Sequence, residues 1–377
     1  MANRKAVVCY YGSWATYRNG PGKFDVTDIN PKLCTHLIYA FAGMNTEGNI
    51  VPLDAHLDLP DNYGRDNYRK FNDLKKQNKN LKTLLAVGGW NLGSAKFSTM
   101  AASSSLRKNF VNSAVNILSK YGFDGLDLDW EYPNQRDTVN GAADVGNFTT
   151  LCRELRSAFD RKGYLLTAAV AAGKSSASRS YDIRGISKYL DMVNLMTYDM
   201  NGGWDNVTGH NAPLHKGEGD QHKGSDDVNT VELALKYWIG AGCPPEKIVL
   251  GVPFYGRTFK LKSASQAGVR APTSGSGMSG QYTTESGFLG YNEIASKFQS
   301  ESWTKRFDSL AKVPYAVKGQ DWLSYDDPKS ITAKIEFAKR LNINKVMVWE
   351  IETDDFRGSS GGGTYPLLKA INNALGF

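Results

Sequence analysis

The sequence predicts a closed (β/α)8 barrel, or TIM barrel, that carries one inserted small domain. Eight short runs rich in apolar and β-branched residues recur along the 377 residues, and helical patterns lie between them. Strands that are apolar nearly throughout and alternate with helices are typical of a parallel sheet buried on both faces. Eight such units typically need about 250 residues, so a surplus remains. The composition, 41% hydrophobic and 22% charged, excludes a disordered or fibrous chain.

The predicted strands span the whole chain. They cover Ala6–Gly12, His36–Gly43, Lys82–Trp90, Gly122–Pro133, Leu165–Ala172, Asp191–Met200, Lys247–Arg257 and Lys345–Thr353. Between the fourth and fifth strands, apolar residues from Phe148 to Phe159 recur at offsets of 3, 4 and 4, which is the face of an amphipathic helix. Between the seventh and eighth, the apolar positions from Ile331 to Leu341 follow Pro328 and Ser330, a typical helix start.

The surplus lies between the seventh strand and the last helix. This segment is rich in Gly, Ser, Tyr and Phe and contains no matching strand–helix unit. We therefore predict a barrel formed by residues 1–258 and 327–377 and an inserted domain formed by residues 259–326. Within it, Gly275–Gly280 fits the pattern G-x-G-x-x-G but follows Pro272 instead of a strand, which favours a flexible loop over a dinucleotide site. No cofactor is predicted.

Charge and hydropathy argue against nucleic-acid and membrane partners. The net charge of +7 is mild for this length, and the basic residues are scattered. The longest cluster, Lys75–Lys79, lies at the predicted end of a helix, where cations suit the helix dipole. No stretch approaches the roughly 18 apolar residues of a membrane span. His210, His215 and His222 fall in a polar loop, where we expect solvated side chains and no metal site.

The four cysteines are too few for a disulfide scaffold. Cys9 and Cys34 each lie near the start of an apolar run, and the two runs are predicted to form neighbouring strands, a suitable setting for one disulfide bridge. For Cys152 and Cys243, buried free thiols and a second bridge both stay open.

Two further signs concern the compartment. N-glycosylation sequons begin at Asn147 and Asn206. Residues 1–4 lead almost at once into strand-like sequence without the apolar core of a signal peptide. Either the protein is cytosolic or a leader has been removed. The sequons and the predicted bridge favour a secreted, extracellular protein whose leader is absent from this chain.

The fourth strand contains a ladder of acidic residues. Side chains alternate along a strand, so Asp127, Asp129 and Glu131 point into the barrel. The alternating residues Leu126, Leu128 and Trp130 point outward. Asp124, at the start of the strand, is predicted to be structural. Glu131 lies nearest the C-terminal end of the strand, where barrel enzymes place their active sites.

Acid/base catalysis explains this ladder better than its alternatives. Burying three acids is costly unless they share protons and hydrogen bonds, so a purely structural role is a poor explanation. An exposed acidic edge strand and an all-carboxylate metal site are the alternatives, but a metal needs further oxygen ligands and the histidines lie elsewhere. Like charges a few ångströms apart push pKa values apart and leave one group protonated near neutral pH.

The run Asp124–Pro133 resembles the signature of family-18 glycoside hydrolases, the chitinases and chitinase-like proteins, and no position departs from it. The segments Leu85–Trp90, Met196–Asp199, Gly251–Arg257 and Val348–Glu350 are similar to this family's third, sixth, seventh and eighth strand motifs. The resemblance therefore covers most of the chain. It implies that the insertion is a small α+β domain, placed between strand 7 and strand 8, which deepens the substrate groove.

The resemblance also implies a mechanism. Glu131 would donate the proton to the glycosidic oxygen, and Asp129 would turn between Asp127 and Glu131 and orient the N-acetyl group of the substrate. A retaining glycosidase normally needs a second carboxylate about 5 Å from the acid, but this family is an exception in which the substrate assists. The acetamido oxygen attacks the anomeric carbon instead. Tyr198 would hydrogen-bond the acetamido group, and Asp199 would hold the sugar beside it.

Aromatic residues at strand ends predict a sugar groove. Chitin is uncharged and flat, so affinity must come from stacking on rings and from a few hydrogen bonds. Four tryptophans fall at or just past the C-terminal ends of predicted strands, namely Trp14, Trp90, Trp204 and Trp349. By the resemblance, Trp349 would form the floor where the bond breaks. The other groove residues that the resemblance implies are Phe41, Gly89, Tyr132, Met196, Tyr255 and Arg257. Packing roles are predicted for the remaining tryptophans, Trp130, Trp238, Trp303 and Trp322.

The resulting hypothesis is a monomeric, retaining, endo-acting hydrolase of chitin and chito-oligosaccharides. Endo and exo cleavage depend on how loops close the ends of the groove. Two alternatives stay open. The family contains lectin-like members in which the residue matching Glu131 is replaced, but Glu131 is present here, which favours an enzyme. The same motif could also support cleavage of the chitobiose core of N-glycans.

Overall fold

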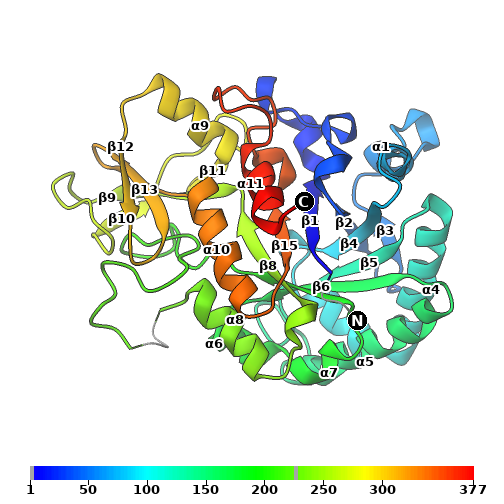
Figure 1. Ribbon diagram of the computed structural model, residues 1–377. Helices are drawn as coiled ribbons and strands as arrows, with labels where there is room; N and C mark the ends of the chain where they lie inside the picture. Colours follow the sequence, from blue (N-terminus) through cyan, green and yellow to red (C-terminus); the bar gives the residue numbers. More distant parts are fainter. Residues whose placement is uncertain (1–3, 225–227) are drawn as a thin grey trace.

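The barrel is closed by eight parallel strands (Figure 1). The computed structural model describes residues 4–224 and 228–377, so the first three of residues 1–4, which precede the first predicted strand, lie outside it. The barrel strands are β1 (Ala6–Gly12), β2 (His36–Met44), β4 (Lys82–Gly88), β5 (Gly125–Asp129), β6 (Leu165–Ala171), β7 (Met192–Met196), β8 (Ile248–Pro253) and β15 (Lys345–Trp349). Each strand pairs with its neighbours in this order, and β15 pairs with β1 to close the ring. The predicted fold class is therefore confirmed.

Helices surround the barrel, and one short strand extends it. The helices are α1 (Ala55–Asp58), α2 (Asn67–Asp73), α3 (Ala95–Ala102), α4 (Ser104–Tyr121), α5 (Ala143–Asp160), α6 (Lys174–Ser180), α7 (Ile183–Ser187), α8 (Val231–Gly240), α10 (Pro328–Arg340) and α11 (Pro366–Leu375). Strand β3 (Ile50–Pro52) pairs antiparallel with β2. The predicted apolar face of α5 is buried, and Pro328 occupies the first turn of α10 with Asp327 as its N-cap. No helix in the described part of the chain is long and apolar enough to cross a membrane.

The seventh predicted strand is two strands in the structure. β8 ends at Pro253, and β9 (Tyr255–Leu261) then joins a second sheet. Between them, the backbone N–H of Phe254 donates to the carbonyl of Trp349 at 2.8 Å, so the chain turns out of the barrel while its polar groups stay satisfied. The prediction of one strand over Lys247–Arg257 is wrong because the apolar run continues across this corner.

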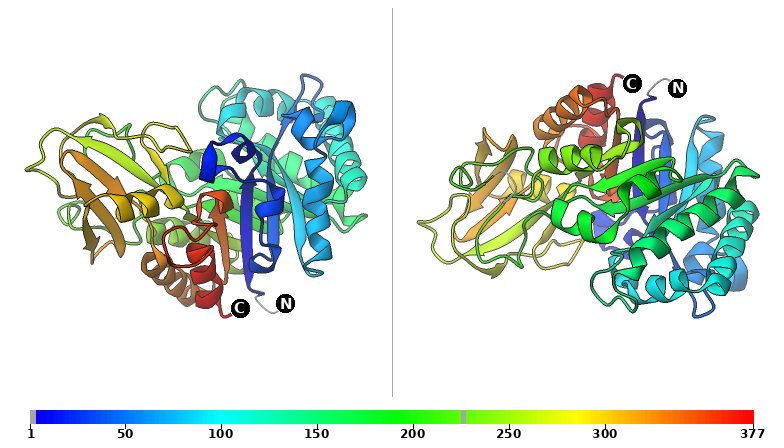
Figure 2. Two further views of the ribbon diagram at one scale, coloured as in Figure 1. Left: turned by 90° about the horizontal axis from the view of Figure 1, so that it is seen from above. Right: turned by 90° about the horizontal axis from the view of Figure 1, so that it is seen from below.

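The second sheet stands beside the barrel, as both views in Figure 2 show. Its order is β10–β9–β14–β13–β12, and β11 pairs with β9. The elements are β10 (Thr273–Ser276), β11 (Phe288–Gly290), β12 (Thr304–Asp308), β13 (Val313–Lys318) and β14 (Asp321–Ser324), together with helix α9 (Tyr291–Ser300). Phe259 and Tyr315 pack around the buried Trp322 on one face of this sheet. An additional α+β unit is thus present where the sequence surplus predicted one.

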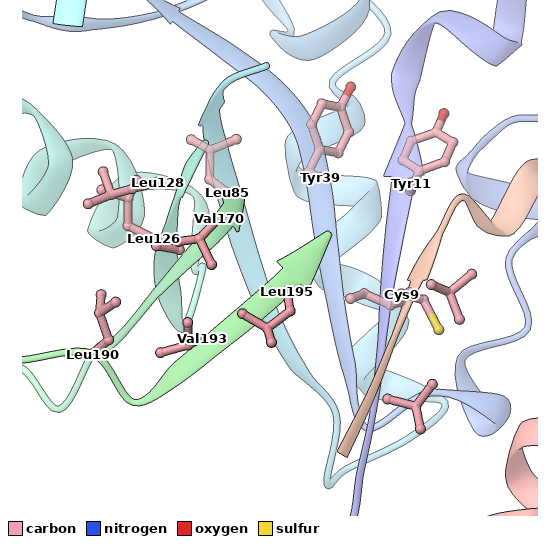
Figure 3. Packing of buried hydrophobic residues seen from close by; sticks show 14 of the residues in the cluster. Cys9, Tyr11, Tyr39, Leu85, Leu126, Leu128, Val170, Leu190, Val193 and Leu195 are labelled. Carbon is pink, nitrogen blue, oxygen red and sulfur yellow. The ribbon is translucent and has the colours of Figure 1, made fainter. Parts of the chain in front are cut away.

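Alternation along the strands separates two apolar layers. Figure 3 shows side chains of the outer layer, among them Leu126, Leu128 and Val193, which pack between the barrel and its helices. The neighbouring positions, including Tyr10 and Met347, fill the barrel interior. Because Leu126 and Leu128 face outward, the residues between and after them must face inward. This places the acidic ladder inside the barrel.

His210 does not lie in solvent. It is 2% exposed, its Nε2 lies 2.9 Å from Oδ2 of Asp308, and its ring packs against Trp322. The prediction of a solvated side chain is wrong here because a carboxylate from β12, far along the chain, pairs with Nε2 of the buried ring. His215 is half-buried beside Glu232, and His222 is exposed. Among the described residues, no cluster of His, Cys, Asp and Glu could hold a metal ion.

The predicted Cys9–Cys34 bridge is not formed in the structure. Both residues are buried free thiols, and their sulfur atoms lie 2.7 Å apart, beyond the roughly 2.05 Å of a disulfide bond. The sequence correctly predicted that the two residues are neighbours, because β1 and β2 pair in parallel. Cys152 and Cys243 are also buried and free.

Candidate active site

Three carboxylates line the barrel interior along β5 and just beyond its end. Asp127 is fully buried, Asp129 is 3% exposed and Glu131 is 9% exposed. Exposure therefore increases toward the C-terminal end of the barrel. β5 itself stops at Asp129, so Glu131 lies in the segment that leaves the sheet.

Asp127 sits at the bottom of this ladder among hydrogen-bond donors. The hydroxyls of Tyr10 and Thr167 each donate to it at 2.5 Å, and the amide of Asn194 donates at 3.3 Å. Burial raises the pKa of Asp127 to about 6, and the three hydrogen bonds oppose this rise. These hydrogen bonds keep the pKa of Asp127 below neutral pH despite its burial.

Burial raises the pKa of both Asp129 and Glu131. Burial raises the pKa of Asp129 well above its usual range, and the charges of Glu131 and Asp127 add to the rise. Its Oδ1 has no hydrogen-bond partner among the described residues. Burial raises the pKa of Glu131 to about 7, against hydrogen bonds with Tyr132 and Asp129 that lower it. Three acids in this arrangement keep a proton next to the groove near neutral pH.

A second polar group is centred on Asp199, after β7. Its Oδ1 accepts hydrogen bonds from the Tyr255 hydroxyl at 2.7 Å and from Nε and Nη2 of Arg257 at 2.9 and 2.7 Å. Tyr198 lies half-buried beside it, with its ring 6.0 Å from that of Tyr255. Met196 is half-buried at the end of β7. Tyr255 and Arg257 reach this group from β9 of the second sheet, and not from the barrel strand that the sequence predicted.

Asn211 holds Asp199 in place and was not predicted. Asp199 has a left-handed backbone with φ of 56°, which is uncommon for a residue other than glycine. Its N–H donates to Oδ1 of Asn211 at 2.8 Å, while the amide of Asn211 donates to the carbonyl of Tyr255 at 3.3 Å. No local pattern marks Asn211, since its partners come from other elements.

Three aromatic rings form one platform beside the ladder. Trp14, Phe41 and Trp349 have ring centroids 5.8 to 6.0 Å apart, and Phe41 stacks on both tryptophans at interplanar angles of 18° and 26°. Gly89 is needed here because a Cβ atom would lie 2.6 Å from the Phe41 ring, and its φ is 87°. The structure thus brings together four of the predicted groove residues.

Two further tryptophans that were predicted to line the groove, Trp90 and Trp204, are exposed. Trp90 is 57% exposed and Trp204 is 61% exposed, and the Arg257 guanidinium lies 5.1 Å from the ring of Trp204. Trp130 is instead buried, where it stacks on Phe97 in the outer layer, as predicted. The predicted packing tryptophans are also placed as expected, since Trp238 and Trp322 are fully buried and Trp303 is half-buried.

A cavity of about 360 Å³ opens between the platform and the second sheet. It is lined by Trp14, Tyr17, Arg18, Asn19, Tyr282, Thr283, Thr284, Glu285, Phe288, Trp349 and Glu350. In it, Arg18 and Glu350 form an ion pair of 3.0 Å. The sequence did not predict the Tyr282–Glu285 segment, because a loop without periodicity gives no sign of where it folds.

A glycosidase site of this form is also indicated by comparison with known proteins. Residues 6–354 match the family described as Glycosyl hydrolases family 18. The chain belongs to glycosyl hydrolase family 18. A Drosophila melanogaster relative named Probable chitinase 2 is 42% identical over 98% of this chain and 80% of its own length. The human Chitinase-3-like protein 2 is 41% identical over 98% of this chain and 92% of its own length.

Solved structures of family 18 proteins match the whole chain. The Group IV chitinase of Ostrinia furnacalis has a TM-score of 0.97 and 52% identity, covering 99% of this chain and 100% of its own. A crystal structure of the same insect chitinase in complex with allosamidin matches equally well. Human YKL-39, described as a pseudo-chitinase with retained chitooligosaccharide binding, has a TM-score of 0.91 and 39% identity, covering 99% of this chain and 100% of its own. The family therefore includes both hydrolases and proteins that only bind.

Proposed function

We propose that this family 18 protein is a chitinase, a retaining, endo-acting hydrolase of β-1,4-linked N-acetylglucosamine polymers. The observation that carries the proposal is the buried ladder, which holds a proton at Glu131, whose pKa is about 7, beside an aromatic platform suited to sugar rings. The likeness to the Group IV chitinase of Ostrinia furnacalis, which was solved in complex with allosamidin, supports the proposal.

In the proposed reaction, the substrate supplies its own nucleophile. Glu131 donates its proton to the glycosidic oxygen while the acetamido oxygen attacks the anomeric carbon, and the leaving sugar departs with the proton. Asp129 orients the acetamido group and balances the positive charge that develops on it, and Tyr198 donates a hydrogen bond to the same group. Glu131, now ionised, then takes a proton from water, which attacks the anomeric carbon and restores the retained configuration.

The groove residues divide into two proposed sets. Trp349, with Phe41, Trp14 and Gly89, would support the sugar where the bond breaks and its neighbour. Trp90 and Trp204 would stack further units, while Tyr132, Met196, Asp199, Tyr255 and Arg257 would enclose the reacting sugar and its substituents. We propose that residues 259–326 act as the domain that deepens this groove, since the Tyr282–Glu285 segment lines the cavity beside the platform.

The compartment is part of the same proposal. We infer a secreted, monomeric protein in which Cys9 and Cys34 are oxidised to a disulfide outside the cell, because their buried sulfur atoms already lie side by side. Asn206 is exposed and Asn147 is half-buried, so the first is the better candidate for glycosylation.

The test is hydrolysis of chitohexaose by the protein and by Glu131→Gln. We expect shorter oligosaccharides from the unmodified protein, and turnover lowered by about 10³-fold or more in the variant, with binding retained. Glu336→Gln on the exposed face of α10 is the matched control and should keep full activity. Full activity of Glu131→Gln would refute the mechanism. Binding without cleavage by the unmodified protein would instead identify a lectin like YKL-39, and release of glycans from a glycoprotein alone would identify an endo-N-acetylglucosaminidase.

A further inference from the structure

Several hydrogen bonds hold the loop after Glu131 in an uncommon backbone conformation. Asn134 and Arg136 both have φ of 58°, in the left-handed region that residues other than glycine seldom occupy. The N–H of Asn134 donates to Asp144 at 2.9 Å, and the amide of Gln135 donates to the Ser180 hydroxyl at 2.6 Å. Two such residues in one short loop persist only where the surroundings determine them, and they are often found at functional sites.

This backbone directs the Arg136 side chain across the mouth of the barrel. The carbon of its guanidinium lies 3.6 Å from the centre of the Trp90 ring, and Nη1 donates to the carbonyl of Trp90 at 2.8 Å and to the carbonyl of Glu131 at 3.1 Å. A planar guanidinium on the face of an indole is a favourable cation–π contact. One side chain therefore links the segment after β4 to the segment after β5.

Two consequences follow from this contact. Arg136 covers one face of an indole that is 57% exposed, so the ring has a fixed orientation and only its other face is open to a sugar. The Arg136 charge also lowers the pKa of Glu131, in opposition to burial. The sequence had marked Trp90 and Glu131 as functional, but not Arg136, which acts on both.

We propose that Arg136 is a positioning residue that holds the Trp90 ring for stacking on an N-acetylglucosamine unit and fixes the Glu131 backbone beside it. This inference rests on the proposed function. Arg136 acts through Trp90 and Glu131 and does not need to touch the reacting atoms.

Two substitutions separate the shape of the guanidinium from its charge. Arg136→Gln removes both, and Arg136→Lys keeps the charge but not the planar stack. For both variants we expect the KM for chitohexaose to rise about 3- to 10-fold. For Arg136→Gln alone, we expect the alkaline limb of kcat/KM to move upward by roughly a few tenths of a pH unit, because the proton on Glu131 is then held to higher pH.

The pH readout is specific because the other groups around Glu131 do not change in these variants. The titratable groups that face it are Asp129, Tyr132, Tyr181, Tyr198 and Asp199. Arg179→Gln is the matched control, because Arg179 is a neighbouring exposed arginine that donates to Gln135 and touches neither Trp90 nor Glu131. This control should keep the KM and the pH profile of the unmodified protein.

Calorimetry with chitohexaose separates this inference from the proposed function. If the unmodified protein binds but does not cleave, the proposed reaction fails, yet Arg136→Gln should still weaken binding by about 3- to 10-fold. Unchanged binding and an unchanged pH limb in Arg136→Gln would overturn the inference, as would a protein that does not bind the oligosaccharide at all. A thermal unfolding midpoint equal to that of Arg179→Gln shows that any loss is not one of folding.

Discussion

Tyr10 and Asp127 meet at the centre of the barrel, where the phenol donates a 2.5 Å hydrogen bond to the carboxylate. The Tyr10 ring also lies against Trp349, with centroids 5.4 Å apart. One side chain thus connects the bottom of the acidic ladder to the aromatic platform. A change at Tyr10 should therefore alter the ionisation of the ladder without removing any group that touches substrate.

Tyr10→Phe tests this connection. Loss of one hydrogen-bond donor should raise the pKa of Asp127 above its present value of about 6. The acidic limb of the pH profile of kcat/KM should therefore move to higher pH by about one unit. The reason is that an ionised Asp127 supplies negative charge that stabilises the cationic intermediate. Tyr11→Phe is the matched control, since the neighbouring buried hydroxyl has no hydrogen-bond partner among the described residues. An acidic limb at the same pH in Tyr10→Phe and Tyr11→Phe would contradict the prediction.

The aromatic platform predicts a length-dependent loss of affinity. Trp14→Ala removes an outer ring of the platform and lining of the cavity, so the KM for chitohexaose should rise about tenfold, with a smaller effect on chitotriose that occupies fewer subsites. Tyr63→Ala is the control, because this ring is fully exposed and lies outside the cavity lining. Steady-state kinetics on the two oligosaccharides would show the difference. An equal loss on both substrates would argue against an extended groove.

Asn211 predicts a positioning effect on Asp199. Asn211→Ala removes the acceptor of the partly buried hydrogen bond from the Asp199 N–H and the donor of the buried hydrogen bond to the Tyr255 carbonyl. Stability should therefore fall by about 1–3 kcal/mol, and the KM should rise. Asn211→Asp keeps the acceptor and should restore part of the KM. Urea unfolding and kinetics measure the two effects separately. If the KM of Asn211→Asp equals that of Asn211→Ala, the hydrogen bond from the Asp199 N–H is not the cause of the rise in KM.

The features that could be predicted from the sequence are those that depend on local or periodic patterns of residues. The ladder was found because alternation along one strand places Asp127, Asp129 and Glu131 on the same side, whatever the rest of the chain does. Asn211 was missed because its partners come from other elements, and Arg136 was missed because the Trp90 ring that it covers follows a different strand. His210 was wrongly expected in solvent because nothing in its own loop shows that Asp308 arrives from β12. The corner at Phe254 was missed because an apolar run reads as one strand even where the chain changes sheets.

The Cys9–Cys34 pair predicts a thiol count. If the protein is secreted and oxidised, unreduced protein in denaturant should have two reactive thiols, those of Cys152 and Cys243, and reduction should raise the number to four. Oxidation of the pair should also raise the thermal midpoint, because a cross-link restricts the unfolded chain. Four thiols in unreduced protein purified from an oxidising compartment would rule out the bridge.

A buried carboxyl outside the groove controls stability through its proton. Asp58, at the end of α1, is 1% exposed, and its Oδ1 accepts a 2.5 Å hydrogen bond from Tyr39. Burial raises the pKa of Asp58 from its ordinary value of 3.8 to about 7, against the hydrogen bond of Tyr39, which lowers it. Between these two pH values, the folded protein holds a proton that the unfolded chain has released.

The stability that Asp58 contributes is therefore complete below about pH 4 and is lost as the pH rises through about 7. Asp58→Asn cannot ionise and still accepts the Tyr39 hydrogen bond, so it should escape this loss. Between pH 5 and pH 8, the free energy of unfolding of the unmodified protein should fall by roughly 2–3 kcal/mol relative to the variant. Urea unfolding at both pH values measures this difference. Asp61→Asn, at a nearby exposed carboxylate, is the control. If the difference in unfolding free energy between the two proteins is the same at pH 5 and pH 8, Asp58 is ionised in the folded protein at both pH values.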